Sequence, residues 1–492
     1  MRISNTFVIL LTLLNCLFSQ APVLLPDEIL NPQQLEKHVH YLASDALQGR
    51  NTGEAGNIQA AKYISDYFEK AGVSLIKGTE SYYQKIPVAK IEAGEGEVYL
   101  MDIKYEHGNQ MLFMQGGKTE VVTDFVFLGF GDKEESYNNT DLNGKVVIVW
   151  QGTEENRNPM DAWALSKSKV KWAYGAQSAG LIELYNIQMP WAGFKNYFKR
   201  ERMEVQKDSY IDLPYAVLFI EDKEQIAKLR NNELNRQGTI SFSGMKMDYP
   251  EVSNVLGYIP GSDERLKEEY VLLSAHFDHV GIKKGVTDGQ DSVYNGARDN
   301  AVGTAALLAA ADYFVQNPPK RSIILAAWNG EEKGLLGSRY FAENPLLPLK
   351  KIVFNLNIDN AGYNDTTAVS VIGYKRTGAT EEMDLAAASL GLKVIADPAE
   401  KQNLFDRSDN VSFASKGIPA PSYSLGFTEF DSEVSRHYHQ LSDHSDTLDF
   451  TYISKYVASY LLAARLVADR TTAPKWLSGD KYEETAKALY GY

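Results

Sequence analysis

Apolar runs that alternate with a helical stretch constrain the second half of this chain most strongly. Residues 270–276, 322–328 and 351–358 are apolar enough to be buried strands, whereas residues 300–314 form an apolar helical stretch. Strands that are apolar on both faces need helices on both sides of their sheet. From residue 252 onward we therefore predict an α/β fold with a mixed, mostly parallel central sheet flanked by helices. Further strand candidates are residues 369–374 and 420–425.

The middle of the chain has a different character, because short strand-like runs dominate it. Residues 121–128, 146–150 and 239–242 are such runs, and turn clusters such as Asn138-Asn139-Thr140 separate them. This pattern predicts a small β-rich insert within the α/β domain, whose first part contains two helical stretches over residues 31–73. The predicted organisation is 21–96 and 251–470 for the two parts of the α/β domain, 97–250 for the insert, and 471–492 for a C-terminal tail.

The first 20 residues have the pattern of a secretory signal peptide. Met1-Arg2 provides a basic start, an apolar run covers residues 6–18, and small residues follow. The run is shorter than the ~20 residues of a membrane span. We expect residues 1–20 to direct export, so that the protein is periplasmic or secreted. The single cysteine, Cys16, lies in this run, and a lipid anchor on it is the alternative.

Charge and hydropathy exclude two classes of partner. The formal net charge is −14, whereas nucleic-acid binding needs a basic face. Residues 452–469 are apolar but contain Lys455, Arg465 and Asp469. We expect this segment to be an amphipathic surface helix, so that no membrane span follows the signal region.

Five polar motifs stand out, most of them where predicted strands end or where the predicted apolar helix begins, and sites in α/β sheets form at these places. Taken singly, each also has a structural explanation: a helix cap, a solvated acidic turn or a polar loop. In an extended chain, the side chains of His276 and Asp278 share one face and that of His279 points away. The motifs are His276-Phe277-Asp278-His279, Asp299-Asn300, Glu331-Glu332, Asn357-Ile358-Asp359 and Arg436-His437-Tyr438-His439 with His444 beyond.

Together, the motifs form a donor set for metal ions. Two histidines and three carboxylates can hold two zinc ions with one carboxylate between them. Co²⁺ or Mn²⁺ would also accept these donors. Of the adjacent Glu331 and Glu332, we expect one to bind metal and the other to act as general base. Spacing alone leaves the last histidine open, since His437, His439 and His444 all qualify.

At these motifs the sequence resembles peptidase family M28, the co-catalytic zinc peptidases. The resemblance extends from about residue 31 to residue 468 and includes Arg407-Ser408-Asp409, although Asn410 stands where the family often has histidine. It implies a zinc-exopeptidase type of fold and a site with these roles: His276 and Asp359 on one Zn²⁺, Glu332 and His439 on the other, Asp299 bridging, Glu331 as general base, Asp278 as partner of His276, and Tyr438 as a donor to the oxyanion.

The predicted insert resembles the protease-associated (PA) domain. Residues 141–149 and 175–180 carry this second resemblance. The module is small, β-rich and usually non-catalytic, so we expect no catalytic residue in it.

The resemblance implies an aminopeptidase that releases N-terminal residues from peptides. A hydroxide between the two ions would be the nucleophile, and Glu331 would pass its proton to the leaving amine. The alternatives are a carboxypeptidase or dipeptidase, a glutaminyl cyclase-like acyltransferase, and a non-catalytic receptor. Residue preference, native metal and oligomeric state are not predicted. No dedicated carboxylate-binding arginine is identifiable, although Arg298, Arg407 and Arg436 are candidates.

Overall fold

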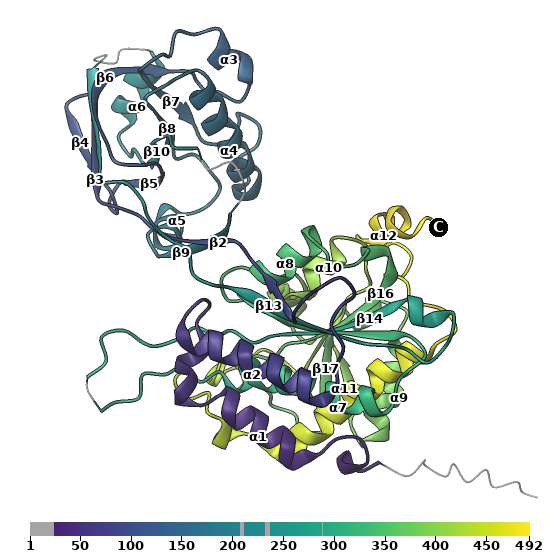
Figure 1. Cartoon of the computed structure of the whole chain (residues 1–492). Coiled ribbons are helices and arrows are strands. Elements are labelled where there is room, and N and C mark those ends of the chain that lie inside the picture. The colour runs from purple at the N-terminus through teal and green to yellow at the C-terminus, as the bar shows by residue number, and fades with distance from the viewer. Residues whose placement is uncertain (1–23, 207–210, 232–236, 288) are drawn as a thin grey trace, which may run out of the picture.

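A mixed eight-stranded sheet is the centre of the larger domain (Figure 1). The computed structural model describes residues 24–206, 211–231, 237–287 and 289–492. Four neighbouring pairs of strands are parallel and three are antiparallel, which confirms the predicted mixed, mostly parallel sheet. The strands, in spatial order, are β1 (Tyr83–Lys85), β13 (Ser253–Ile259), β15 (Ser322–Trp328), β14 (Tyr270–His276), β16 (Ile352–Ile358), β19 (Ser422–Leu425), β17 (Ala368–Ile372) and β18 (Lys393–Ala396).

Helices cover both faces of this sheet because its central strands are apolar on both. In β14, Leu273 and Ala275 pack into one core and Leu272 packs into the other, as period-2 alternation requires. The first core also contains residues of α1 (Pro32–Leu42), α2 (Ala55–Ala71), α7 (Val302–Gln316), α9 (Thr380–Ser389) and α11 (Phe450–Asp469). The second contains residues of α8 (Leu336–Glu343), α10 (Asn410–Ala414) and α12 (Glu483–Tyr490).

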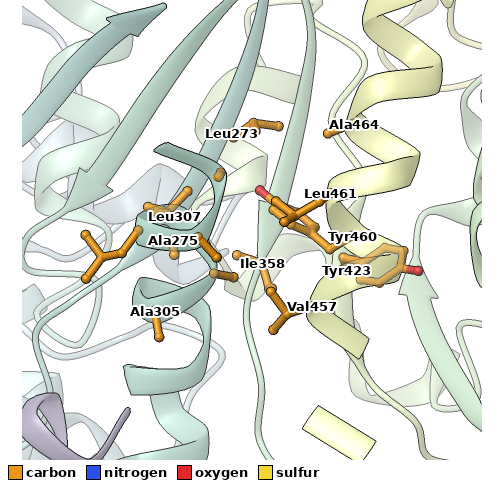
Figure 2. Close-up of a cluster of buried hydrophobic side chains, with 14 of the residues drawn as sticks. Leu273, Ala275, Ala305, Leu307, Ile358, Tyr423, Val457, Tyr460, Leu461 and Ala464 are labelled. Atoms are coloured by element: carbon orange, nitrogen blue, oxygen red, sulfur yellow. The ribbon is translucent and has the colours of Figure 1, made fainter. Parts of the chain in front are cut away.

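The expectation of a surface helix at residues 452–469 is wrong. Val457, Leu461 and Ala464 of α11 belong to the first core together with Leu273 of β14, and Figure 2 shows Val457 near Ile358 of β16. Tyr460 is fully buried there and donates a hydrogen bond to the Leu356 carbonyl at 2.9 Å. Tyrosine side chains contribute large buried area with one polar group to satisfy, so this helix is a central packing element despite its charged residues.

The inserted part of the chain, between β1 and β13, forms a second eight-stranded sheet, as Figure 1 shows. Strands β6, β7, β8 and β10 run parallel, and the outer strands pair antiparallel. In spatial order they are β4 (Ile103–Glu106), β3 (Gly96–Leu100), β11 (Gln237–Phe242), β6 (Thr119–Phe127), β7 (Val146–Trp150), β8 (Gly180–Leu184), β10 (Tyr215–Leu218) and β5 (Met111–Gln115). The accompanying helices are α3 (Glu134–Asn138), α4 (Pro159–Gly175), α5 (Trp191–Phe198) and α6 (Lys223–Arg230). The resemblance of this domain to the PA module stays a prediction.

A small antiparallel sheet stands where the chain passes between the two domains (Figure 1). It consists of β12 (Lys246–Asp248), β2 (Val88–Glu92) and β9 (Arg202–Val205). Strand β2 leads into the inserted domain and β12 leads out of it, and Lys246 pairs with Glu92. The chain therefore enters and leaves the inserted domain at one place.

The two ends of the chain differ in what the structure describes. The expected signal peptide at residues 1–20, including Cys16, lies outside the described residues. Within those residues, none of the helices combines the length and the hydropathy that crossing a bilayer takes.

The predicted C-terminal tail packs on the larger domain. Trp476 and Ala486 are buried in the second core, and Arg376 forms an ion pair with Asp480 at 2.7 Å.

Candidate metal centre

Three neighbouring parallel strands bring the predicted motifs to one edge of the sheet. His276 is the last residue of β14, Asp359 directly follows β16, and Glu331 and Glu332 come shortly after β15. Because β14 lies between β15 and β16 and is parallel to both, these strand ends meet. This is the carboxyl edge at which α/β folds place their sites.

Two groups of donor atoms form at this edge and share Asp299. In the first group, His276 Nε2 lies 3.3 Å from Asp299 Oδ1 and 3.2 Å from Asp359 Oδ1. In the second, His439 Nε2 lies 3.1 Å from Asp299 Oδ2 and 3.1 Å from Glu332 Oε1. Asp299 thus turns one carboxylate oxygen toward each group. The structure brings together all five residues that were predicted as ligands.

The donor chemistry of the two groups fits zinc. In each group the candidate ligand atoms lie within 4.8 Å of one another, a spacing that one ion can span. Imidazole nitrogen and carboxylate oxygen are common zinc donors, and an aspartate with one oxygen for each group suits a two-metal site. Such acids are costly to bury together without cations. Two divalent ions would supply that positive charge.

In the chain itself, protonated histidines offset these acids. Burial lowers the pKa of His439, but its hydrogen bonds to Asp299 and Glu332 outweigh this and raise the pKa to about 10. Burial acts against the charged form of His276 as well, yet the Asp359 and Asp299 carboxylates raise its pKa well above the ordinary value. Opposite charges at these distances favour both charged forms.

A turn before α7 fixes the position of Asp299. The backbone N–H groups of Arg298 and Asp299 donate to the Asp443 carboxylate at 3.0 and 3.3 Å. The Asn300 side chain accepts from the Gly303 N–H at 3.2 Å and donates to the Ile358 carbonyl at 2.9 Å. Asn300, and not Asp299, therefore provides the side-chain hydrogen bond at the start of this helix, which leaves the Asp299 carboxylate to face the donor groups.

Asp278 has a different set of partners from the one that the resemblance implied. Its carboxylate accepts hydrogen bonds from the backbone N–H groups of Glu331 at 3.1 Å and Glu332 at 3.2 Å, and from the Thr52 hydroxyl at 3.0 Å. His276 Nδ1 is closer to the Asp278 backbone carbonyl, at 3.2 Å, than to its carboxylate, at 3.7 Å. Asp278 thus holds the loop that carries the two glutamates, in addition to lying beside His276.

His279 belongs to the second donor group, contrary to the expectation that it points away. Its Nδ1 lies 2.8 Å from Glu332 Oε1 and 3.8 Å from Asp299 Oδ2, and its side chain is buried. The alternation of an extended strand does not apply here, because β14 ends at His276 and His279 instead forms an isolated bridge with Asn51. The other two histidine candidates lie outside both groups: His437 contacts the Ser442 carbonyl, and His444 pairs with Asp291 at 3.2 Å.

Arg50 lies buried beneath the site and was not predicted from the sequence. Its guanidinium donates to the carbonyls of Phe277 at 2.8 Å, Asn295 at 2.7 Å and Gly296 at 3.0 Å, and also to that of Leu42. These carbonyls flank the strand end and the turn that carry the candidate ligands. Arg50 therefore ties the N-terminal segment to the floor of the site.

Residues 254–463 match the family model described as Peptidase family M28. The larger domain belongs to peptidase family M28. The vacuolar membrane protease of Kluyveromyces lactis is 28% identical over 257 residues, which are 51% of this chain and 25% of that protein. The vacuolar membrane protease of Lodderomyces elongisporus is 33% identical over 138 residues, which are 27% of this chain and 13% of that protein. The matched segments thus span a quarter or less of these curated relatives.

Among solved structures, an aminopeptidase from Aneurinibacillus sp. strain AM-1 resembles the chain with a TM-score of 0.55 at 18% identity. The similarity covers 91% of this chain and 96% of that one. At this identity, the similarity supports the fold.

A small cavity of about 90 Å³ opens from the first donor group of the M28 domain. Tyr438 lines it, stacked on the His439 ring with centroids 4.0 Å apart. Burial and the nearby carboxylates raise the pKa of Tyr438 above its ordinary value, so the phenol stays protonated at neutral pH and can donate. Glu331 also lines the cavity and belongs to neither donor group.

Replacing Asp278 by asparagine is expected to lower zinc affinity and kcat by about 10- to 100-fold. An amide oxygen accepts the Glu331 and Glu332 N–H bonds less strongly than a carboxylate does, and the NH₂ group cannot accept them. Zinc titration and steady-state kinetics would measure both effects. The exposed Asp291 offers the matched control, Asp291→Asn. Unchanged zinc affinity in Asp278→Asn would contradict the role of Asp278 in positioning the loop that carries Glu331 and Glu332.

Zinc binding is expected to release protons and to strengthen as the pH rises. The pKa values of His276 and His439 are raised in the metal-free chain, so both imidazoles carry a proton at neutral pH and must lose it to bind a metal. The affinity should therefore be lowest in acid and should increase toward pH 10, where His439 deprotonates without metal. Calorimetry at pH 7 in buffers of different ionisation enthalpy should show about one proton released per histidine. Release of no protons would contradict the protonated resting state.

Proposed function

We propose that this chain is a two-zinc aminopeptidase, which removes the N-terminal residue from peptides. The observation that carries the proposal is the pair of donor groups sharing Asp299, with Glu331 beside them in a cavity. Family membership, and the protease and aminopeptidase names of similar proteins, support peptide-bond hydrolysis. The cavity favours an exopeptidase, because at about 90 Å³ it is far below the ~300–1,000 Å³ of typical ligand pockets and suits one side chain.

His276 and Asp359 would hold one ion, Glu332 and His439 the other, and Asp299 both; His279, whose Nδ1 is 2.8 Å from Glu332, completes the second group. Two zinc ions bound here would polarise the scissile carbonyl, activate a water molecule and lower the pKa of Glu331 through their charge.

Glu331 is the proton carrier in this proposal. Burial, together with the charges of Asp359 and Glu332, raises its pKa well above the ordinary value, so its carboxyl group binds a proton readily. A carboxyl group with a raised pKa can take a proton and return it within one turnover. The Asp278 carboxylate fixes the backbone of Glu331 at 3.1 Å, which holds the proton carrier in place.

Tyr438 and the carboxylates of the cavity have separate roles in this proposal. The protonated phenol of Tyr438 donates toward the oxygen that gains charge when the peptide carbonyl is attacked. The free amine of a substrate N-terminus is attracted by the carboxylates that line the cavity, Glu331 and Asp359 among them. A blocked N-terminus lacks that attraction, which favours aminopeptidase over carboxypeptidase activity.

We also propose that the protein is exported, on the pattern of residues 1–20.

Metal analysis combined with a substrate series tests the proposal. We expect two zinc ions per chain and hydrolysis of leucine 4-nitroanilide but not of its N-acetyl derivative. Release of C-terminal residues from blocked peptides would establish a carboxypeptidase instead. A single zinc with pyroglutamate formation from N-terminal glutamine would establish a cyclase, and absence of any turnover would leave a binding protein.

A further inference from the structure

The wall of the active-site cavity contains one arginine. Apart from His276, Arg407 is the one basic side chain among the lining residues. The polar remainder of the wall is neutral or acidic, and five apolar side chains complete it. The lining residues used in this argument are Glu331, Asp359, Arg407, Leu404, Phe427 and Phe430.

Arg407 differs from the other two candidate arginines in being unpaired. Arg298 is buried, and its guanidinium donates to Asp443 at 2.9 Å and to Thr447 at 2.8 Å. Arg436 lies outside the cavity lining and pairs with Glu433 at 3.4 Å. Across the described ranges of the chain, the Arg407 guanidinium has neither a hydrogen bond nor an ion pair, and the residue is exposed. Its donors are therefore available to a ligand that enters the cavity.

The lining of the cavity carries charges of both signs. Glu331 and Asp359 are acidic and attract a cationic group of the substrate, whereas Arg407 attracts an anionic one. A guanidinium presents a planar fork of donors that matches a carboxylate in two parallel hydrogen bonds. A substrate with an ammonium and a carboxylate close together complements charges of both signs.

We propose that Arg407 binds a carboxylate of the substrate and makes this enzyme selective for peptides that present one at the cavity. The inference rests on the proposed function and names its substrate class. Two sources of the carboxylate share this chemistry: the side chain of an N-terminal glutamate or aspartate, and the terminal carboxylate of a dipeptide. In both cases Arg407 offsets the repulsion that Glu331 and Asp359 exert on the substrate anion.

Pairs of substrates that differ by one charge test the proposal and separate the two sources. The first pair is the α-4-nitroanilides of glutamate and glutamine, and the second is dialanine and its amide. In zinc-loaded wild type we expect kcat/KM to favour the charged member of one pair by about 10- to 100-fold, as a charge-assisted hydrogen bond provides. Arg407→Gln should bring that ratio close to one.

Two further variants make the result specific. Arg407→Lys keeps the charge but loses the planar fork, so it should retain part of the selectivity. Arg436→Gln removes an arginine that does not line the cavity. This variant should show the same kcat/KM ratio between the charged and the uncharged substrate as wild type. Ratios near one in wild type, or a ratio that survives Arg407→Gln, would overturn the inference even if the protein is an aminopeptidase.

A binding measurement keeps the inference testable if the proposed function fails. Calorimetric titration of the zinc-loaded chain with glutamate, glutamine, diglycine and diglycine amide needs no turnover. Tighter binding of glutamate than glutamine, or of diglycine than its amide, should disappear in Arg407→Gln. That result without any hydrolysis would reject the aminopeptidase and support Arg407 as a carboxylate site, whereas equal binding within both pairs would reject the site.

Discussion

Substitution of Glu331 by glutamine is expected to lower kcat by about 100- to 10,000-fold, the range that general acid–base groups contribute. The amide keeps the size and hydrogen-bonding shape of the side chain but cannot take up and return a proton at neutral pH. Glu331 belongs to neither donor group, so the variant should still bind two zinc ions. Steady-state kinetics on leucine 4-nitroanilide and zinc analysis of the same preparation measure the two effects.

Glu343 provides the control for this substitution. It is an exposed glutamate at the end of α8, and Glu343→Gln should match wild type in both measurements. If Glu331→Gln bound fewer than two zinc ions, Glu331 would be a ligand and the assignment of the base would be wrong. If it kept wild-type kcat with full zinc content, another group would have to move the proton.

Substitution of Asp299 by asparagine is expected to remove zinc from the site and nearly all activity with it. Asp299 is the residue that both donor groups share, and it turns one oxygen to each. An amide has one acceptor oxygen and no charge, so it cannot replace both contacts. The zinc content should fall to one ion or fewer per chain. The loss in kcat/KM should exceed the ~100-fold that removal of an outer partner of a ligand costs.

Thermal unfolding of the zinc-free proteins separates this effect from misfolding. Asp299 is buried against Asp443 and two histidines, so the variant and wild type should be compared without metal. A zinc-free Asp299→Asn chain that unfolds cooperatively and still binds a single ion would locate the loss at the shared donor. Two tightly bound zinc ions in Asp299→Asn would contradict the shared position.

Local sequence patterns predicted much of the fold. The strands at residues 146–150, 270–276 and 322–328 have the predicted bounds, because each is a continuous apolar run that ends at a polar residue or a turn. Helix α11 shows the limit of this reasoning. Its charged residues suggested a surface position, but its tyrosines pack between sheet and helices, and burial depends on neighbours that the local pattern does not contain.

The candidate site was predictable where its residues lie in short motifs at strand ends. His276, Glu331, Glu332 and Asp359 fall on three adjacent parallel strands, and the carboxyl ends of such strands must meet. His279 was missed because the strand ends before it, so alternation could not give its direction. A histidine three residues beyond a buried strand that ends at a predicted ligand was the available signal.

The parts of the site that depend on distant contacts could not be predicted. Arg50 reaches Phe277 across 227 positions of sequence, and Thr52 reaches Asp278 across 226. The sequence marks this segment only as a polar, glycine-containing loop. Asp443, which is 145 residues from Arg298 in the sequence, likewise forms a buried ion pair with it at 2.9 Å. No spacing rule connects such pairs.

Because β2 pairs with β12, the chain leaves the catalytic domain and returns to it at neighbouring points, and the inserted domain lies between these points. Lys246 lies opposite Glu92, so the residues between them begin and end at adjacent points of one small sheet. Closing a longer loop costs only about 0.6 kcal/mol for each doubling of its length. The catalytic domain therefore tolerates modules of very different size at this point. Exchange of such modules between relatives can change what approaches the metal centre while leaving the ligands themselves in place.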